Sequence, residues 1–129
     1  MKRILLIVFV ACVISACKKT GVSPGIFGKW ELREVAGGDF AYQDSVYKAG
    51  NGNIYQFNAD STYTAYLNHN QSAHGIFHIR KNTNPSANSV NILLFDSNTE
   101  GLPITVNGTT MMLVTVAGWF QDRYQKISN

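Results

Sequence analysis

The sequence predicts an all-β fold, a small antiparallel up-and-down barrel of eight strands. From residue 28 onward, short segments alternate apolar and polar side chains, which is typical of half-buried strands. No stretch of that region keeps apolar residues at helical spacing for three turns. Gly and Asn gather between the apolar segments, where they favour tight turns. Eight antiparallel strands can close on themselves and so remove exposed sheet edges.

The alternation of apolar and polar side chains predicts the strands one after another along the chain. In the first, Trp30 and Leu32 share one face and the charged residues around them share the other. Residues 90–95 form the most apolar segment, which suits a central strand. The expected strands cover residues 28–36, 53–57, 62–68, 76–80, 90–95, 102–106, 109–116 and 119–127.

Turn signals separate these strands. Residues 58–61 (NADS) carry short side chains that bond their own backbone. Asn107-Gly108 between two apolar segments is a strong hairpin signal, because both residues accept positive φ. We expect another turn over 71–75, and a helical turn around 42–48 within the long polar connection 37–52.

The first residues have the pattern of a signal peptide. Two basic residues precede an uninterrupted apolar run from Ile4 to Ile14, and small residues and a cysteine follow it. The run is shorter than the roughly 20 apolar residues that a membrane-spanning helix needs. We therefore expect residues 1–16 to be removed, residues 17–26 to form a lipidated N-terminus and flexible tether, and residues 27–129 to form one barrel domain.

Ile14-Ser15-Ala16-Cys17 resembles the lipobox of bacterial lipoproteins. The resemblance implies cleavage before Cys17 and acylation of this residue, with palmitate among the acyl chains, and two or three chains give a lasting membrane anchor. Lys18 and Lys19 differ from the inner-membrane retention signal, in which an aspartate follows the cysteine, so we expect an outer-membrane anchor that faces the periplasm. The alternative is an ordinary secretory signal cut after Ala16, which would leave a free thiol.

Composition narrows the function classes. Without Lys2 and Arg3 the formal charge of +3 falls to +1, and no basic stripe supports a nucleic-acid partner. Cys12 lies in the signal peptide and Cys17 is the expected lipid site, so no thiol remains for a disulfide or a nucleophile. The sequence also carries no serine-hydrolase elbow, phosphate-binding loop or zinc-protease motif. We expect no enzymatic activity and no cofactor.

Gly28-Lys29-Trp30 at the start of the first strand resembles the G-x-W signature of lipocalins. The chain is similar to the small lipocalin-like domains of bacterial lipoproteins in further segments: Tyr55-Gln56-Phe57, Asp60-Ser61-Thr62-Tyr63, Gly75-Ile76-Phe77 and Tyr124-Gln125-Lys126. In lipocalins the tryptophan plugs the closed end of the barrel beneath a late arginine. The resemblance thus implies that Trp30 is the plug and Arg123 its cover. The chain is shorter than typical lipocalins and lacks their disulfide and C-terminal helix.

A ligand-binding hypothesis depends on aromatic residues at alternating strand positions. These residues are Tyr55, Phe57, Tyr63, Phe77 and Phe95. They either line an apolar pocket or fill the barrel core. Filling is the commoner outcome in a domain of this size.

Metal binding is the other chemistry to weigh. His74 and His78 would lie about 13 Å apart on one strand, too far to share an ion. His69 and His74 can meet across a turn, but two ligands fall short of the three or four that zinc usually takes. The acidic residues are scattered, and 96–100 lacks the spacing of an EF-hand. We expect no metal site.

The leading prediction is a non-enzymatic, lipid-anchored envelope lipoprotein whose barrel binds a small apolar ligand or an envelope partner. The alternative is a structural or interaction lipoprotein with a solidly packed barrel. In that case the loops 37–52 and 81–89 would contact another envelope protein or a glycan.

Overall fold

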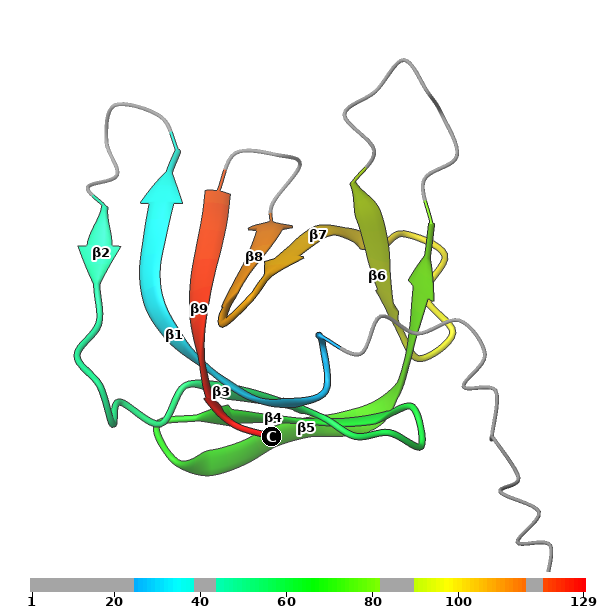
Figure 1. Cartoon of the computed structure of the whole chain (residues 1–129), viewed down its shortest axis with the longest axis horizontal. Coiled ribbons are helices and arrows are strands. Elements are labelled where there is room, and N and C mark those ends of the chain that lie inside the picture. The colour runs from blue at the N-terminus through cyan, green and yellow to red at the C-terminus, as the bar shows by residue number, and fades with distance from the viewer. Residues whose placement is uncertain (1–24, 39–43, 82–89, 116–119) are drawn as a thin grey trace, which may run out of the picture.

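The computed structural model describes residues 25–38, 44–81, 90–115 and 120–129, which contain nine strands and no helix (Figure 1). The strands are β1 (Gly28–Gly37), β2 (Ser45–Val46), β3 (Ile54–Phe57), β4 (Thr62–Leu67), β5 (Asn70–Arg80), β6 (Asn91–Phe95), β7 (Leu102–Asn107), β8 (Thr110–Thr115) and β9 (Phe120–Ser128). No helix in the described part of the chain is long and apolar enough to cross a membrane. The expected signal peptide and Cys17 lie outside the described residues.

The strands form one antiparallel sheet that closes on itself. Each strand from β3 to β9 pairs with the next, β1 pairs with β3, and β1 also pairs with β9. These eight strands make an up-and-down barrel, which confirms the predicted fold class (Figure 1). The short strand β2 is an addition that pairs with the second half of β1.

Two loop predictions were wrong. The connection before β3 contains strand β2 at Ser45–Val46, where we expected part of a helical turn. The expected turn over 71–75 lies inside β5, because the chain has already reversed at Asn68 and His69. These two residues have φ of 49° and 68°, the pattern of a type I′ hairpin turn. Leu67 and Asn70 pair across it.

Two other predicted turns lie at the expected position or within one residue of it. In the turn at 58–61, Asp60 Oδ1 accepts hydrogen bonds from the backbone N and the hydroxyl of Thr62, at 2.9 and 2.6 Å. The β7–β8 hairpin is confirmed, but its loop lies one residue later than predicted, because Asn107 pairs with Thr110. Gly108 alone of the two loop residues has positive φ, 57°, and a glycine in this first position is typical of a type II′ turn.

Trp30 lies at the end of the barrel where β1 begins and is fully buried. Its Nε1 donates a hydrogen bond of 2.6 Å to the carbonyl of Ile26. Ile26 is itself 1% exposed and belongs to the core cluster. Lys126 Nζ lies 5.4 Å from the centre of the indole ring. Arg123 does not take this place, because it pairs with Glu34 on the outer face of the barrel at 2.8 Å.

Candidate ligand-binding site

A cavity of about 270 Å³ lies inside the barrel, on the far side of Tyr55 from Trp30. Its walls are mostly aliphatic and aromatic, with Asn53 and Ser72 as polar members, and come from β1, β3, β4, β5, β9 and the connection before β3. They include Leu32, Tyr47, Tyr55, Ala65, Leu67 and Tyr124. The volume is just below the usual range for ligand pockets, so the cavity suits only a small molecule.

The cavity and the tryptophan occupy opposite ends of the barrel. Leu32 follows Trp30 on the same face of β1 and pairs with Tyr124 of β9. Lys126, two residues beyond Tyr124, lies over the indole. Leu67 at the end of β4 lines the cavity and is 59% exposed. The mouth of the cavity is therefore at the end formed by the β4–β5 turn and the connection before β3.

Four of the five predicted aromatic residues form the packed floor below the cavity. The ring centres of Phe57 and Phe77 are 4.9 Å apart, and those of Tyr63 and Phe95 are 4.5 Å apart. The ring centres of Phe57 and Phe95 are 6.3 Å apart, and this contact connects the two pairs. Both Phe57 and Phe77 are 1% exposed, so filling of the core accounts for this part of the cluster.

Tyr55 is the member of the predicted set that also lines the cavity. Its ring stacks on Phe57 at 5.8 Å and on Phe95 at 5.6 Å. The ring of Tyr124 lies 5.6 Å away, with the two planes inclined at 58°. Tyr55 thus joins the packed floor to the open part of the barrel. Burial, and secondarily the charge of Asp122, raise the pKa of the Tyr55 hydroxyl.

The hydroxyl of Tyr63 is held by a carboxylate outside the cavity. It donates to Asp96 Oδ2 at 3.1 Å, while Asp96 Oδ1 accepts from the backbone N of Ile76 at 3.0 Å. Gly75 makes this possible, because a Cβ there would collide with the Asp96 carboxylate. Burial and the bond to Asp96 raise the pKa of Tyr63. The group has a structural role that ties β4 and β5 to the β6–β7 loop.

The three histidines do not assemble a site in the described part of the chain. His69 is in the β4–β5 turn, His74 pairs with Thr64, and His78 pairs with Leu94. Among the described residues, no group of three or more His, Cys, Asp or Glu side chains is placed to hold a metal ion.

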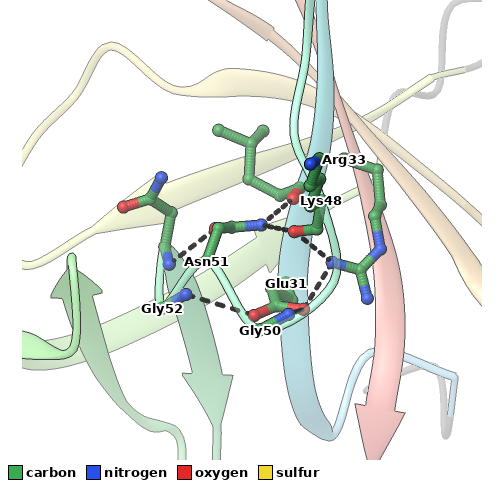
Figure 2. Close-up of polar contacts among 8 residues, drawn as sticks. Glu31, Arg33, Lys48, Gly50, Asn51 and Gly52 are labelled. Atoms are coloured by element: carbon green, nitrogen blue, oxygen red, sulfur yellow. Dashed lines mark hydrogen bonds and ion pairs between the residues drawn. The ribbon is translucent and has the colours of Figure 1, made fainter.

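A buried carboxylate on the outer face of β1 holds the connection that reaches the mouth (Figure 2). Glu31 is only 3% exposed, because residues 48–52 cover it. Its Oε2 accepts from the backbone N of Gly50 at 3.0 Å and its Oε1 from that of Gly52 at 3.2 Å. Arg33 forms an ion pair with the same carboxylate. All of its oxygen atoms are thus engaged, as a buried charge requires.

Asn51 completes the attachment of this connection to β1. Its Nδ2 donates to the carbonyls of Leu32 and Lys48 at 2.8 and 2.7 Å. Its Oδ1 accepts from the backbone N of Asn53 at 2.9 Å. The backbone N of Tyr47 donates to the carbonyl of Arg33 at 2.8 Å. These bonds bring Tyr47 to the cavity wall, so contacts outside the barrel shape the site inside it.

Asp122 places a carboxyl group inside the barrel. It pairs with Leu113, which is 1% exposed, and it lies on the same face of β9 as Tyr124. The side chain of Thr115 donates a hydrogen bond to it. Burial raises the pKa of Asp122. In Tyr124 the pKa is raised strongly, mainly by burial and then by Tyr55 and Asp122, so the Asp122 charge acts on two cavity tyrosines.

The sequence hypothesis did not include Tyr47, Tyr124 or Glu31. Two-residue alternation back from Lys126 along the last strand could have placed Tyr124 and Asp122 on one face. No local signal could have placed Tyr47, because its position depends on contacts of the connection with β1. Comparison of the chain with protein-family models, with curated proteins and with solved structures found no match.

Proposed function

We propose that the protein is a lipid-anchored envelope lipoprotein whose lipocalin-like barrel binds a small, largely apolar ligand. The observation that carries this proposal is the cavity of about 270 Å³ at the end of the barrel opposite Trp30. Its walls are mostly apolar or aromatic, and its floor is packed. An eight-stranded barrel is just wide enough to hold one such molecule. The proposed activity is binding rather than catalysis.

The location is the second part of the proposal. The segment Ile14-Ser15-Ala16-Cys17 supports cleavage before Cys17 and acylation of its thiol. The lysines that follow favour an outer-membrane anchor with the barrel in the periplasm. The ligand would then be a small molecule of the envelope.

The test uses a neutral fluorescent probe, N-phenyl-1-naphthylamine, whose emission rises in an apolar site. The eight described barrel strands close around their own core, so the chain from residue 18 onward is suitable. We expect saturable binding by the unchanged chain and at least tenfold weaker binding by Ala65→Phe, because the new ring occupies the cavity. Thr64→Phe adds the same ring at the neighbouring position, whose side chain points out of the barrel, and should bind as the unchanged chain does.

Circular dichroism melts of both variants show whether each is folded. If Ala65→Phe unfolds, Leu67→Trp at the exposed rim replaces it. Absence of saturable binding by the unchanged chain would overturn the proposal, and so would equal binding by folded cavity and control variants.

The edge strand β2 favours a second candidate function, an interaction lipoprotein. Val46 is 82% exposed, and large exposed apolar residues at a sheet edge suit a protein partner. A photocrosslinker at position 46 in intact cells tests this candidate. A single crosslinked envelope protein that Val46→Asp no longer binds would support it, and no crosslink above that from position 64 would exclude it.

A further inference from the structure

We propose that the ligand carries an alkylated ammonium group, bound between the cavity tyrosines and Asp122. This inference rests on the proposed function, and it specifies the chemical class of the ligand. It combines the arrangement of the aromatic rings with the charges that face the interior of the barrel.

The aromatic rings form a corner rather than a stack. The ring centres of Tyr55 and Tyr124 are 5.6 Å apart, and their planes are inclined at 58°, so they make adjoining walls. Tyr47 lines the same cavity from the connection before β3. The faces of aromatic rings attract cations, and several rings around one space are the arrangement that recognises quaternary ammonium groups.

The charges inside the barrel favour a cation at this end. On β9 the inward face carries Asp122, Tyr124 and Lys126 in order. Lys126 is at the far end, over Trp30. Asp122 lies two residues from Tyr124 in the opposite direction, and the residues that line the cavity carry no charge of their own. Asp122 is not itself a lining residue, but it lies beyond Tyr124 on the side away from Trp30, whereas Lys126 lies on the side of Trp30. A ligand next to these tyrosines is therefore nearer to the negative group than to the positive one.

The nearest arginines do not change this balance. Arg33 forms its ion pair with Glu31 on the outer face of β1. Arg123 is paired with Glu34, also outside the barrel. Both positive charges are compensated by carboxylates on their own side of the sheet, whereas Asp122 has the neutral hydroxyl of Thr115 as its hydrogen-bond donor. Among the described residues no basic side chain forms an ion pair with Asp122, and an ammonium group is the ligand chemistry that would supply a positive charge there.

The test compares choline with 3,3-dimethylbutan-1-ol, which has the same shape but a neutral carbon in place of the nitrogen. Binding to residues 18–129 is followed by NMR chemical shifts at pH 7. We expect choline to bind at least tenfold more tightly than the alcohol. Asp122→Asn should remove this preference and leave binding of the alcohol unchanged. Glu100→Gln, which removes an exposed carboxylate from the β6–β7 loop, should keep the preference.

A second series does not depend on the folding of Asp122→Asn. Tyr47→Leu should weaken choline binding at least threefold, and Tyr47→Phe, which keeps an aromatic face, should restore it. Equal binding of choline and the alcohol would overturn the ammonium inference while leaving the cavity proposal intact. The same holds if the naphthylamine probe binds and choline does not. Failure of the probe, choline and the alcohol alike would overturn both proposals.

Discussion

Glu31 and Glu34 are three residues apart on β1, and each pairs with an arginine. Glu31 has a side chain 4% exposed and accepts two backbone hydrogen bonds, whereas the Glu34 side chain is 27% exposed and its partner Arg123 53%. Surface ion pairs contribute little, because water screens them. Variants of the two glutamates therefore measure how burial changes the contribution of such an ion pair to stability.

Replacing Glu31 by Ala leaves the backbone N–H groups of Gly50 and Gly52 without their acceptor. We expect a loss of about 1–3 kcal/mol in the free energy of unfolding, the usual cost of unsatisfied buried polar groups. For Glu34→Ala we expect a loss of about 0–1 kcal/mol. Urea unfolding of the two variants measures both values. Equal losses would contradict the role of Glu31 as the attachment point of residues 48–52.

The same carboxylate makes stability depend on pH. Burial by itself would raise the pKa of Glu31, but hydrogen bonds from Gly50, Arg33 and Gly52, with the charge of Arg33, outweigh it and lower the pKa. The folded state therefore takes up the proton less readily than the unfolded chain. The contribution of Glu31 is complete above the unfolded-state pKa of about 4.3 and is lost as pH falls through the folded-state value.

We expect the stability difference between the unchanged chain and Glu31→Gln to be constant near neutral pH. It should shrink as pH falls below about 4.3, because the unfolded chain then binds a proton at Glu31 that the folded chain does not yet bind. Urea unfolding at a series of pH values gives the difference. A difference that persists unchanged to pH 3 would refute a lowered pKa at Glu31.

At the scale of the elements, the connection before β3 meets the β4–β5 turn. The backbone N of His69 donates to the carbonyl of Gly52 at 3.0 Å. Gly50 and Gly52 both have positive φ, 79° and 75°. A Cβ on Gly52 would lie 2.5 Å from the backbone N of His69, whereas one on Gly50 would meet nothing within 4 Å. The two glycines thus share a backbone conformation but differ in surroundings.

Gly50→Ala should cost about 1–2 kcal/mol, because an L-residue is strained in this region of φ. We expect Gly52→Ala to cost more, because the added Cβ also collides with His69. This collision would push the β4–β5 turn away from the connection before β3. Thermal unfolding of the two variants tests the order. If Gly52→Ala were as stable as Gly50→Ala, the turn and the connection would not be tightly packed.

The elements were largely predictable from sequence, for local reasons. Alternation identified the eight barrel strands, and the Asp60 turn followed from side-chain chemistry. The start of β5 was missed because Asn68-His69 adopts a turn that Asn-Gly or Asp-Gly usually signals. Strand β2 was missed because both of its residues are exposed, so burial leaves no alternating pattern to read.

At the scale of the whole molecule, the proposed anchor and the barrel are separate parts. Cys17→Ser should abolish incorporation of radioactive palmitate and leave the chain uncut at residue 16, because acylation needs the thiol. Labelling of cells followed by electrophoresis measures both effects. Cys12→Ser changes the other cysteine, within the expected signal peptide, and should be labelled normally. Normal labelling of Cys17→Ser would refute the lipid assignment.

The site was less predictable than the barrel. Periodicity identified the five aromatic residues but could not separate Tyr55, at the cavity, from Phe57 and Phe77, in the packed floor. That distinction depends on strand stagger around the closed barrel. The position of Arg123 was taken from a resemblance, whereas the register of β9 places Lys126 opposite Trp30.

The position of Ile26 has a practical consequence. The chain enters the barrel beside Trp30, and β9 leaves it at the same end, where Ser128 pairs with Lys29 (Figure 1). Both ends of the described domain therefore lie at the end of the barrel away from the cavity mouth. A purification tag or a sensor surface attached to either one leaves the mouth free.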